Sequence, residues 1–411
     1  MYIIEAALEY LISLLVTGSY LATITKELGL DDGLTGILSA ITSLGCLFQI
    51  LSISYRRTTV KGLVVTLSII NQLLFCLLYV IPIVSLTKEA KTVIFIVFIV
   101  SAYIFYNFAH PKKIAWLMSL VDDGMRGSFT ATKEIVSLIS GMLFSFGMGA
   151  LIDSFTEAGR TREAFIICAA VILALMILHT VTLSLSVEKE RKSPEKEGKG
   201  HMLQGFIAVL RDKSILKITA IYVIYQIATF ASLPFFGTYM IGELNMTLTT
   251  ITALSMVGSI ARIFVSRPLG RYADKRSFAA LIEKCFLFLM ASFVCVAFAT
   301  PRTGIPAFAL YNILHGIAMG GINSSLTNLI FDYAPEEKRA DALVISQSAA
   351  GVIGFLTSLT MSGVVRRIQE GGNTLFGMTV YAQQLCAVIS FIFVLIATVY
   401  VRVVIIKKEN K

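Results

Sequence analysis

Two apolar segments of the chain carry the same polar residues at the same spacing: a tyrosine, an asparagine directly after it, and a histidine three positions further on. The two sets are Tyr106, Asn107 and His110, and Tyr311, Asn312 and His315. Asparagine and histidine three positions apart share one face of a helix, and ionisable residues inside a membrane are candidates for ligand binding or proton transfer. A structural hydrogen bond between helices is the competing interpretation of each histidine.

Lys113 continues the polar face of the first set, three positions after His110. A lysine at the centre of a bilayer costs about 2.5–3.5 kcal/mol, so two interpretations compete. In the first, Lys113 lies at the inner membrane interface beside Trp116 as a cationic anchor. In the second, it faces a central cavity and pairs with Glu134 or with an anionic substrate.

Two other apolar segments carry polar residues at helical spacing. They are the predicted spans 6–27 and 214–240. The span 6–27 also contains Gly18, which permits the helix to unwind locally. Together, the four polar stripes provide the candidates for substrate contact. These candidates are Thr17, Tyr20, Asn107, His110, Lys113, Tyr222, Tyr225, Gln226, Asn312 and His315.

Twelve long apolar segments must position these side chains. About 20 apolar residues cross the hydrocarbon core of a bilayer as one helix. The composition agrees, because 56% of the residues are hydrophobic and only 15% are charged. We therefore expect an all-α, polytopic membrane protein. The predicted spans are 6–27, 33–54, 61–83, 92–113, 131–152, 164–186, 214–240, 248–266, 279–299, 305–330, 342–364 and 378–403.

Basic residues gather in every second connection between these spans. With the N-terminus inside, most of the 35 lysines and arginines fall on the cytoplasmic side, which predicts a multi-pass protein of the cytoplasmic membrane with both termini in the cytoplasm. This topology explains the net charge of +9 without nucleic acid as a partner. Glu5 and Glu9 stand where a signal peptide would be basic, so we expect the first span to be retained.

The longest polar stretch, 187–213, mixes charges of both signs with proline and glycine and reads as a cytoplasmic linker. It separates a predicted N-terminal six-helix bundle, 1–186, from a C-terminal six-helix bundle, 214–411. Segment 126–141 resembles segment 339–354, and segment 26–40 resembles segment 242–256, which suggests an internal duplication with pseudo-symmetric bundles. Repeat halves in transporters hold the substrate between them near the midplane of the membrane.

The predicted turn after the eighth span reads Gly270-Arg-Tyr-Ala-Asp274-Lys275-Arg-Ser277. It resembles the loop signature of the major facilitator superfamily, with Ser277 in place of the second glycine. In that family the turn acts as a latch between helices when the inner side is closed, and Gly270 is expected to allow close backbone approach. The resemblance, which points to an unassigned bacterial branch, covers essentially the whole chain. The gating candidates that it implies, with the loops preceding two spans, are Arg126, Glu134, Gly270, Asp274, Lys275 and Arg339.

The resemblance implies a secondary transporter that moves a small solute by alternating access. We expect a monomer in the bilayer that uses no cofactor or metal, with a proton or sodium ion as the candidate coupling ion. No acidic residue lies in the middle third of a predicted span, so an obvious coupling carboxylate is expected to be absent.

Two alternatives stay open. An exporter of amphipathic, drug-like compounds is weakened because the fifth span lacks the Gly-Pro-x-x-Gly-Gly ending of drug–proton antiporters in this superfamily. A membrane sensor or enzyme is the other alternative. We expect no enzyme, because the six cysteines lack metal-ligand spacing, no nucleotide-binding glycine loop is present, and clustered catalytic dyads are missing.

Overall fold

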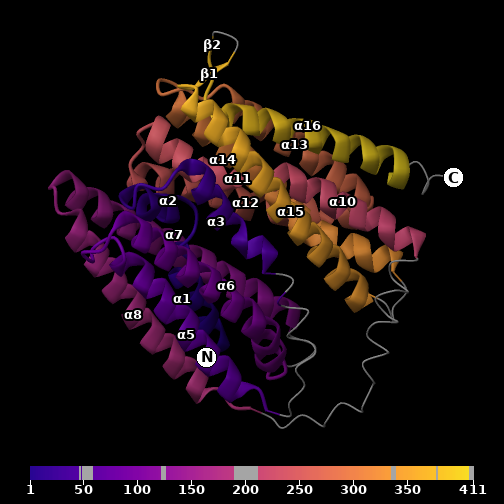
Figure 1. The fold of residues 1–411 in the computed structure, drawn as a ribbon. Helices are drawn as coiled ribbons and strands as arrows, with labels where there is room; N and C mark the ends of the chain where they lie inside the picture. The colour runs from indigo at the N-terminus through magenta and orange to yellow at the C-terminus, as the bar shows by residue number, and fades with distance from the viewer. Residues whose placement is uncertain are drawn as a thin grey trace. The chain divides into compact units, whose positions relative to one another are not determined.

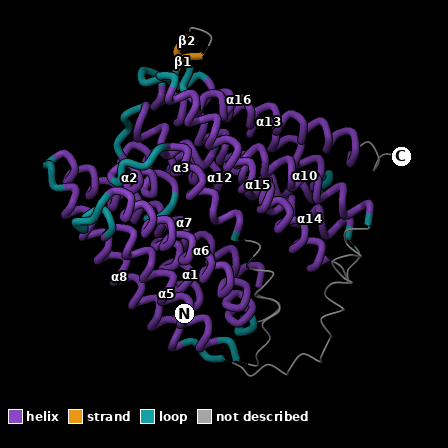
Figure 2. Tube along the Cα trace, viewed as in Figure 1, coloured by secondary structure: helices purple, strands orange, loops and turns teal. Residues whose placement is uncertain are grey.

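The computed structural model describes residues 1–45, 48, 59–121, 126–188, 212–334, 339–375 and 378–406, and these residues are mainly helical (Figures 1 and 2). Contacts divide the chain into two compact units. The first unit comprises Met1–Glu195 and Met246–Ala253, and the second comprises Lys196–Asn245 and Leu254–Lys411. Most of the predicted linker lies outside the described residues.

In the first unit, α1 packs against α7 and α8, while α5 packs against α6 and α8. Side chains at two helix starts satisfy backbone amides, as expected of N-caps: the Asp31 carboxylate accepts from Leu34 N, and the Thr87 hydroxyl accepts from Ala90 N. The helices are α1 Tyr2–Leu14, α2 Gly18–Glu27, α3 Asp32–Leu44, α5 Lys61–Val80, α6 Lys88–Met118, α7 Arg126–Glu157 and α8 Thr161–Leu185.

In the second unit, α13 packs against α14 and α16, and α10 packs against α15 and α16. A short antiparallel pair of strands pairs Thr374 with Thr379. The elements are α10 Lys213–Phe230, α11 Leu233–Thr238, the π-helical turn η2 Tyr239–Glu243, α12 Leu248–Lys275, α13 Phe278–Ala297, α14 Gly304–Tyr333, α15 Arg339–Glu370, β1 Thr374–Leu375, β2 Met378–Thr379, α16 Ala382–Tyr400 and the π-helical turn η4 Val401–Ile406.

Within the described residues, eleven helical segments are long and apolar enough to cross a membrane. The second predicted span, 33–54, is described as a helix over α3, and most of its remainder lies outside the described residues. The predicted all-α membrane fold is confirmed.

Several helix ends differ from the prediction. Helix α6 continues through Pro111 to Met118, and α12 continues through Pro268 to Lys275. The predicted turn 270–277 is therefore mostly helix, and its last residue, Ser277, is the N-cap that accepts from Ala280 N. Hydropathy marks where apolar side chains stop, whereas a backbone helix continues wherever its hydrogen bonds remain favourable. The last span begins at Ala382 instead of 378, because β2 occupies 378–379.

Candidate functional site

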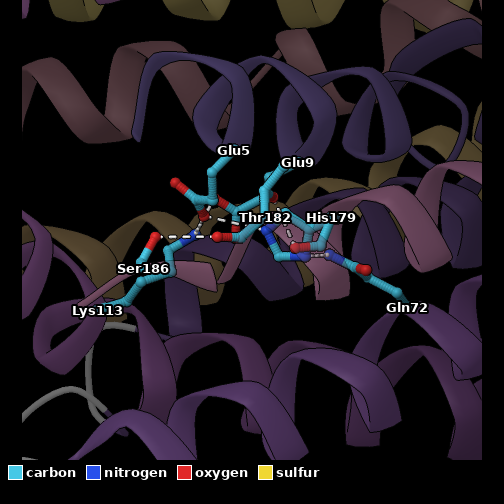
Figure 3. A network of polar contacts seen from close by, with 7 residues as sticks. All are labelled: Glu5, Glu9, Gln72, Lys113, His179, Thr182 and Ser186. Atoms are coloured by element: carbon cyan, nitrogen blue, oxygen red, sulfur yellow. Dashed lines mark hydrogen bonds and ion pairs between the residues drawn. The ribbon is translucent and has the colours of Figure 1, made fainter. Parts of the chain in front are cut away.

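A cluster of ionisable side chains is buried among α1, α5, α6 and α8 of the first unit (Figure 3). The Lys113 ammonium lies 2.7 Å from Glu5 Oε1 and also pairs with Glu9. Glu5 is completely buried and Lys113 is 3% exposed. An unpaired charge at such a position would be strongly destabilising, so these ion pairs allow the charges to be buried.

The cluster extends through His179 to Gln72, which are both buried. His179 Nε2 lies 3.0 Å from Glu5 Oε1, and His179 Nδ1 lies 2.9 Å from Gln72 Nε2. The amide nitrogen can only donate, so Nδ1 accepts and Nε2 carries the proton that is donated to Glu5. Within the described part of the chain, Glu5 Oε2 and Gln72 Oε1 are buried without a hydrogen-bond partner.

The sequence places these groups together through ordinary helical spacing. Glu5 and Glu9, four positions apart, share one face of α1. On α6, the helix continues past Pro111, so Lys113 remains on a helical face and Trp116 follows it. The Trp116 indole donates to the Val187 carbonyl at 3.0 Å, which ties α6 to the chain that leaves α8.

The start of α5 is held against the same end of α8. The Lys61 ammonium donates to the carbonyls of Ser184 and Ser186 at 2.7 and 2.9 Å. The Glu188 carboxylate accepts from the backbone amides of Val60 and Lys61 at 2.5 and 3.1 Å, where a negative charge suits the start of a helix. These contacts fix the helix ends around the buried cluster.

The structure contradicts two of the expectations for Lys113. Its side chain is buried and paired with Glu5 and Glu9, unlike an interfacial anchor, and it does not pair with Glu134, which is exposed on α7. Contact of Lys113 with a substrate stays a prediction. No acidic residue lies in the middle third of a predicted span, but the structure buries the Glu5 carboxylate, which the sequence did not indicate. Both glutamates lie in the first turns of α1: Glu5 precedes the first predicted span, 6–27, and Glu9 lies in its first third. Their spacing within an apolar stretch, and His179 inside the sixth span, were the available signals.

The donor atoms of Glu5, Glu9 and His179 lie within 4.8 Å of one another, a spacing that could hold a metal ion. The Lys113 ammonium already provides the positive charge beside both carboxylates. Two carboxylates and one ammonium leave a single negative charge, so a divalent ion would turn the buried cluster net positive. The arrangement therefore suits a network of ion pairs better than a metal centre.

The two asparagines adopt the same local geometry in the two units. Asn107 Nδ2 donates to the Tyr103 carbonyl at 2.9 Å, and Asn312 Nδ2 donates to the Phe308 carbonyl at 2.7 Å. Each asparagine also lies against a glycine of another helix or turn, Asn107 against Gly45 and Asn312 against Gly258. A Cβ on Gly45 would lie 2.0 Å from Asn107 Nδ2. Both hydrogen bonds are made within one helix, four positions back along the chain.

The ring of each histidine in the repeated sets packs against the ring of the tyrosine four positions before it. The ring centroids lie 4.8 Å apart for Tyr106 and His110, and 5.2 Å apart for Tyr311 and His315. Both histidines are half-buried. The sequence repeat thus has a matching side-chain arrangement in the two units.

The first helix of each unit is interrupted. In the first unit, α1 ends at Leu14 and α2 begins at Gly18, whose φ of 54° lies in the left-handed region; the predicted unwinding at Gly18 is confirmed. The Tyr79 hydroxyl donates to the Leu15 carbonyl at 2.6 Å, which satisfies one backbone group that the break leaves free.

The second interruption separates α10 from α11. The Ser358 hydroxyl donates to the carbonyl of Phe230, the last residue of α10, at 2.8 Å. The Ser390 hydroxyl donates to the Ser232 hydroxyl at 2.8 Å, and Ser232 is fully buried. Hydroxyl groups from neighbouring helices therefore form hydrogen bonds with polar groups at this interruption as well.

The other candidates for substrate contact have varied surroundings. Thr17 bonds to the Ser13 carbonyl at 3.0 Å, and the Tyr20 hydroxyl donates to the Ser145 carbonyl. Tyr225 stacks on Phe286 and donates to the Met319 sulfur, so it belongs to a packed core. The remaining two lie on α10, where Tyr222 is buried and Gln226 is half-buried.

Among the gating candidates, Gly270 does not have the role in packing that was expected. A Cβ at Gly270 would meet nothing within 4 Å. The expectation that a glycine is needed there for close backbone approach was therefore wrong. Lys275 is exposed at the end of α12. Arg126 and Arg339 begin α7 and α15, but their side chains and that of Asp274 lie outside the described side chains.

Solved structures with the same fold are membrane transporters. The nucleoside transporter NupG, in a mutant form, gives a TM-score of 0.70 at 14% identity over 97% of this chain and 98% of its own. The POT family transporter PepTSo gives 0.71 at 11% identity over 97% and 96%. A D-xylose-proton symporter gives 0.66 at 12% identity over 96% and 95%. At these identities the likeness concerns the fold alone.

A search of curated proteins found no match. The family model described as Major Facilitator Superfamily matches residues 6–358. Because this match covers most of the chain and agrees with the fold, the protein belongs to the Major Facilitator Superfamily and is a multi-pass membrane transporter, not an enzyme.

Proposed function

We propose that this protein is a secondary transporter that moves a small polar solute across the cytoplasmic membrane by alternating access of two six-helix bundles, with both termini in the cytoplasm. The observation that carries the proposal is the paired interruption of the first helix in each unit, at α1/α2 and at α10/α11. Interrupted helices at corresponding positions of two repeats are the usual place of substrate binding in transporters.

The side chains around these interruptions favour an uncharged polar solute. Thr17 is at the first interruption, and Gln226 lies one turn before the end of α10. Hydroxyl and amide groups bind solutes by hydrogen bonds without requiring a charge. Lys113 is already neutralised by two carboxylates, so its ammonium does not call for an anionic substrate. The proposed contacts are Thr17, Tyr20, Asn107, His110, Lys113, Tyr222, Tyr225, Gln226, Asn312 and His315.

The charged residues at the helix ends are proposed to control the opening of the cytoplasmic side. Lys275 lies exposed at the end of α12, where a cation suits the C-terminal end of a helix. Arg126 and Arg339 start the two helices that the internal repeat relates. The proposed gating residues are Arg126, Glu134, Gly270, Asp274, Lys275 and Arg339.

A binding screen followed by a flux measurement tests this function. The purified protein in detergent is heated with a panel of nucleosides, D-xylose and short peptides, the solute classes of transporters with the same fold. A ligand that binds the folded state raises the apparent unfolding temperature. The best stabiliser is then used, radiolabelled, in counterflow with proteoliposomes. Absence of exchange for every stabilising solute would overturn the proposal.

Two matched variants locate the site in the same flux assay. Thr17→Val is expected to lower counterflow, because Thr17 lies at the interruption. Thr23→Val is the control, since the Thr23 hydroxyl, inside α2, makes the same kind of bond to a backbone carbonyl, at 2.9 Å to Ser19. Equal rates for both variants would remove Thr17 from the proposed site.

A further inference from the structure

We propose that the buried cluster in the first unit is a proton-binding site, in which His179 holds the proton and the Gln72 amide rotates to accommodate it. This inference rests on the proposed transport function, for which it names the coupling ion. The contacts in Figure 3 carry it: Gln72 to His179, His179 to Glu5, and Glu5 to Lys113.

The charge of the cluster calls for one more positive charge. Two carboxylates, Glu5 and Glu9, face a single ammonium on Lys113. With His179 neutral, the cluster carries one uncompensated negative charge in a buried place, which is unfavourable. A proton on His179 Nδ1 makes the imidazole positive beside the Glu5 carboxylate and brings the cluster to neutrality.

The Gln72 amide can serve both protonation states. In the structure its Nε2 donates to His179 Nδ1, an arrangement that only a neutral ring permits. Its Oε1 is buried and without a hydrogen-bond partner in the described part of the chain. A half-turn of the amide brings Oε1 to Nδ1, where it accepts the new N–H bond. The unpartnered Gln72 Oε1 thus has a role: it accepts the hydrogen bond from Nδ1 when His179 is protonated.

The surrounding groups are mostly acceptors or already paired. Glu5 and Glu9 reach the site from α1, and Gln72 reaches it from α5. Helix α6 contributes Lys113, which is paired with both carboxylates, together with half-buried His110. From α7, the Lys133 ammonium lies over the Tyr2 ring, 5.3 Å from its centroid.

Glu9 offers the entry route for the proton. Its side chain is 20% exposed, whereas those of Glu5, Lys113 and His179 are at most 3% exposed. We therefore infer that a proton enters the cluster beside Glu9 and binds to the lone pair of His179 Nδ1, which the Gln72 amide releases as it rotates. When it leaves, the electron pair returns to Nδ1 and the proton returns to water, so no other bond changes.

Nitrogen NMR of the full-length protein in lipid nanodiscs tests the inference directly. The chain has four histidines, so ¹⁵N-histidine labelling yields few signals, and His179→Gln assigns the signal of interest by its loss. Unperturbed histidines change charge between about pH 5 and 8, and the titration covers this range. At the alkaline end we expect the neutral ring with its proton on Nε2, and at the acidic end a ring protonated on both nitrogens.

Two substitutions of Gln72 sharpen the test. Gln72→Glu places a carboxylate opposite Nδ1 and is expected to keep His179 doubly protonated across the range. Gln72→Leu removes the acceptor and is expected to eliminate the doubly protonated signal. The His315 signal, from the second unit, is the internal control for folding and should be the same in all variants. A single His179 tautomer throughout the range in the unsubstituted protein would overturn the proposal, as would a proton on Nδ1 alone at alkaline pH.

A flux measurement separates this inference from the proposed function. With the solute that the binding screen identifies, an inward proton gradient should drive accumulation in proteoliposomes, and His179→Gln should lose accumulation while keeping counterflow. Accumulation that is equally strong in His179→Gln would overturn proton coupling at this cluster and leave transport intact. Absence of any flux in the unsubstituted protein would instead overturn the transport function, whatever the NMR shows.

Discussion

Replacing Lys113 by methionine tests whether the buried cluster stabilises the first unit as its geometry implies. The change keeps the length of the side chain but removes the ammonium between Glu5 and Glu9. At the 2.7 Å separation from Glu5 Oε1, the attraction is about 6 kcal/mol for an effective dielectric constant near 20. The loss of one partner from a buried ion pair costs about 3–5 kcal/mol, since the remaining charge is left uncompensated.

This loss is measurable as a lower thermal midpoint of the purified protein. For a unit of roughly 150–250 residues, 1 kcal/mol corresponds to about 2–4 °C, so Lys113→Met should lower the midpoint by on the order of 10 °C. Unfolding of a membrane protein is often irreversible, so all variants are heated at one scan rate.

The neighbouring lysine provides a matched control. Lys112 lies one position earlier on α6, with its ammonium 5.9 Å from the centroid of the Phe108 ring. Such a contact at a partly exposed site contributes about 0.5–1 kcal/mol, so Lys112→Met should change the midpoint by only a few degrees. Equal effects of the two substitutions would refute the reasoning, because the loss would then reflect lysine removal in general.

A compensating variant distinguishes charge from packing. Adding Glu5→Gln and Glu9→Gln to Lys113→Met removes both carboxylates that the substitution left unpaired. Neutral replacement of a whole buried ion network is often close to neutral in stability, so most of the lost midpoint should return. If the triple variant is no more stable than Lys113→Met, the cost of the single substitution comes from packing.

Three further changes probe other parts of the structure. Gly45→Ala should cost about 1–3 kcal/mol of stability, because its Cβ would lie 2.0 Å from Asn107 Nδ2, whereas Gly62→Ala, with nothing within 4 Å, should leave the thermal midpoint unchanged. Tyr79→Phe removes the hydroxyl that bonds to the carbonyl at the first interruption and should lower the free energy of unfolding by about 1–3 kcal/mol, measured as a lower thermal midpoint; an unchanged midpoint would show that this bond is dispensable. Asp274→Ala should lower counterflow while membrane insertion, followed by fluorescence of a C-terminal tag, stays normal; unchanged counterflow would end its proposed gating role.

Some features of the candidate site could be predicted because they depend on neighbouring residues along the chain. Gly18 was expected to permit unwinding, and α1 and α2 are interrupted there. The ring contacts of Tyr106 with His110 and of Tyr311 with His315 were not predicted, although each joins residues four positions apart on one helix. In both cases the relevant partners lie within a few residues, so helical geometry alone relates them.

The sequence by itself determined the membrane class and the approximate positions of the spans. The hydrocarbon core of the bilayer has the same thickness for every span. The length of an apolar segment is therefore enough to predict that it crosses the membrane. The ends of the helices were predicted less well. Helix α12 continues to Lys275, past the predicted end of the span at 266, because backbone hydrogen bonds do not depend on apolar side chains.

Only the tertiary structure decided which ionisable groups meet. Lys113 pairs with Glu5 across 108 positions of the chain, and His179 reaches the same carboxylate across 174 positions. Whether a charge can be buried depends on the partners that neighbouring helices present in a low-dielectric interior. No local pattern specifies that neighbourhood, so the same lysine that resembled a surface anchor is the centre of a buried network.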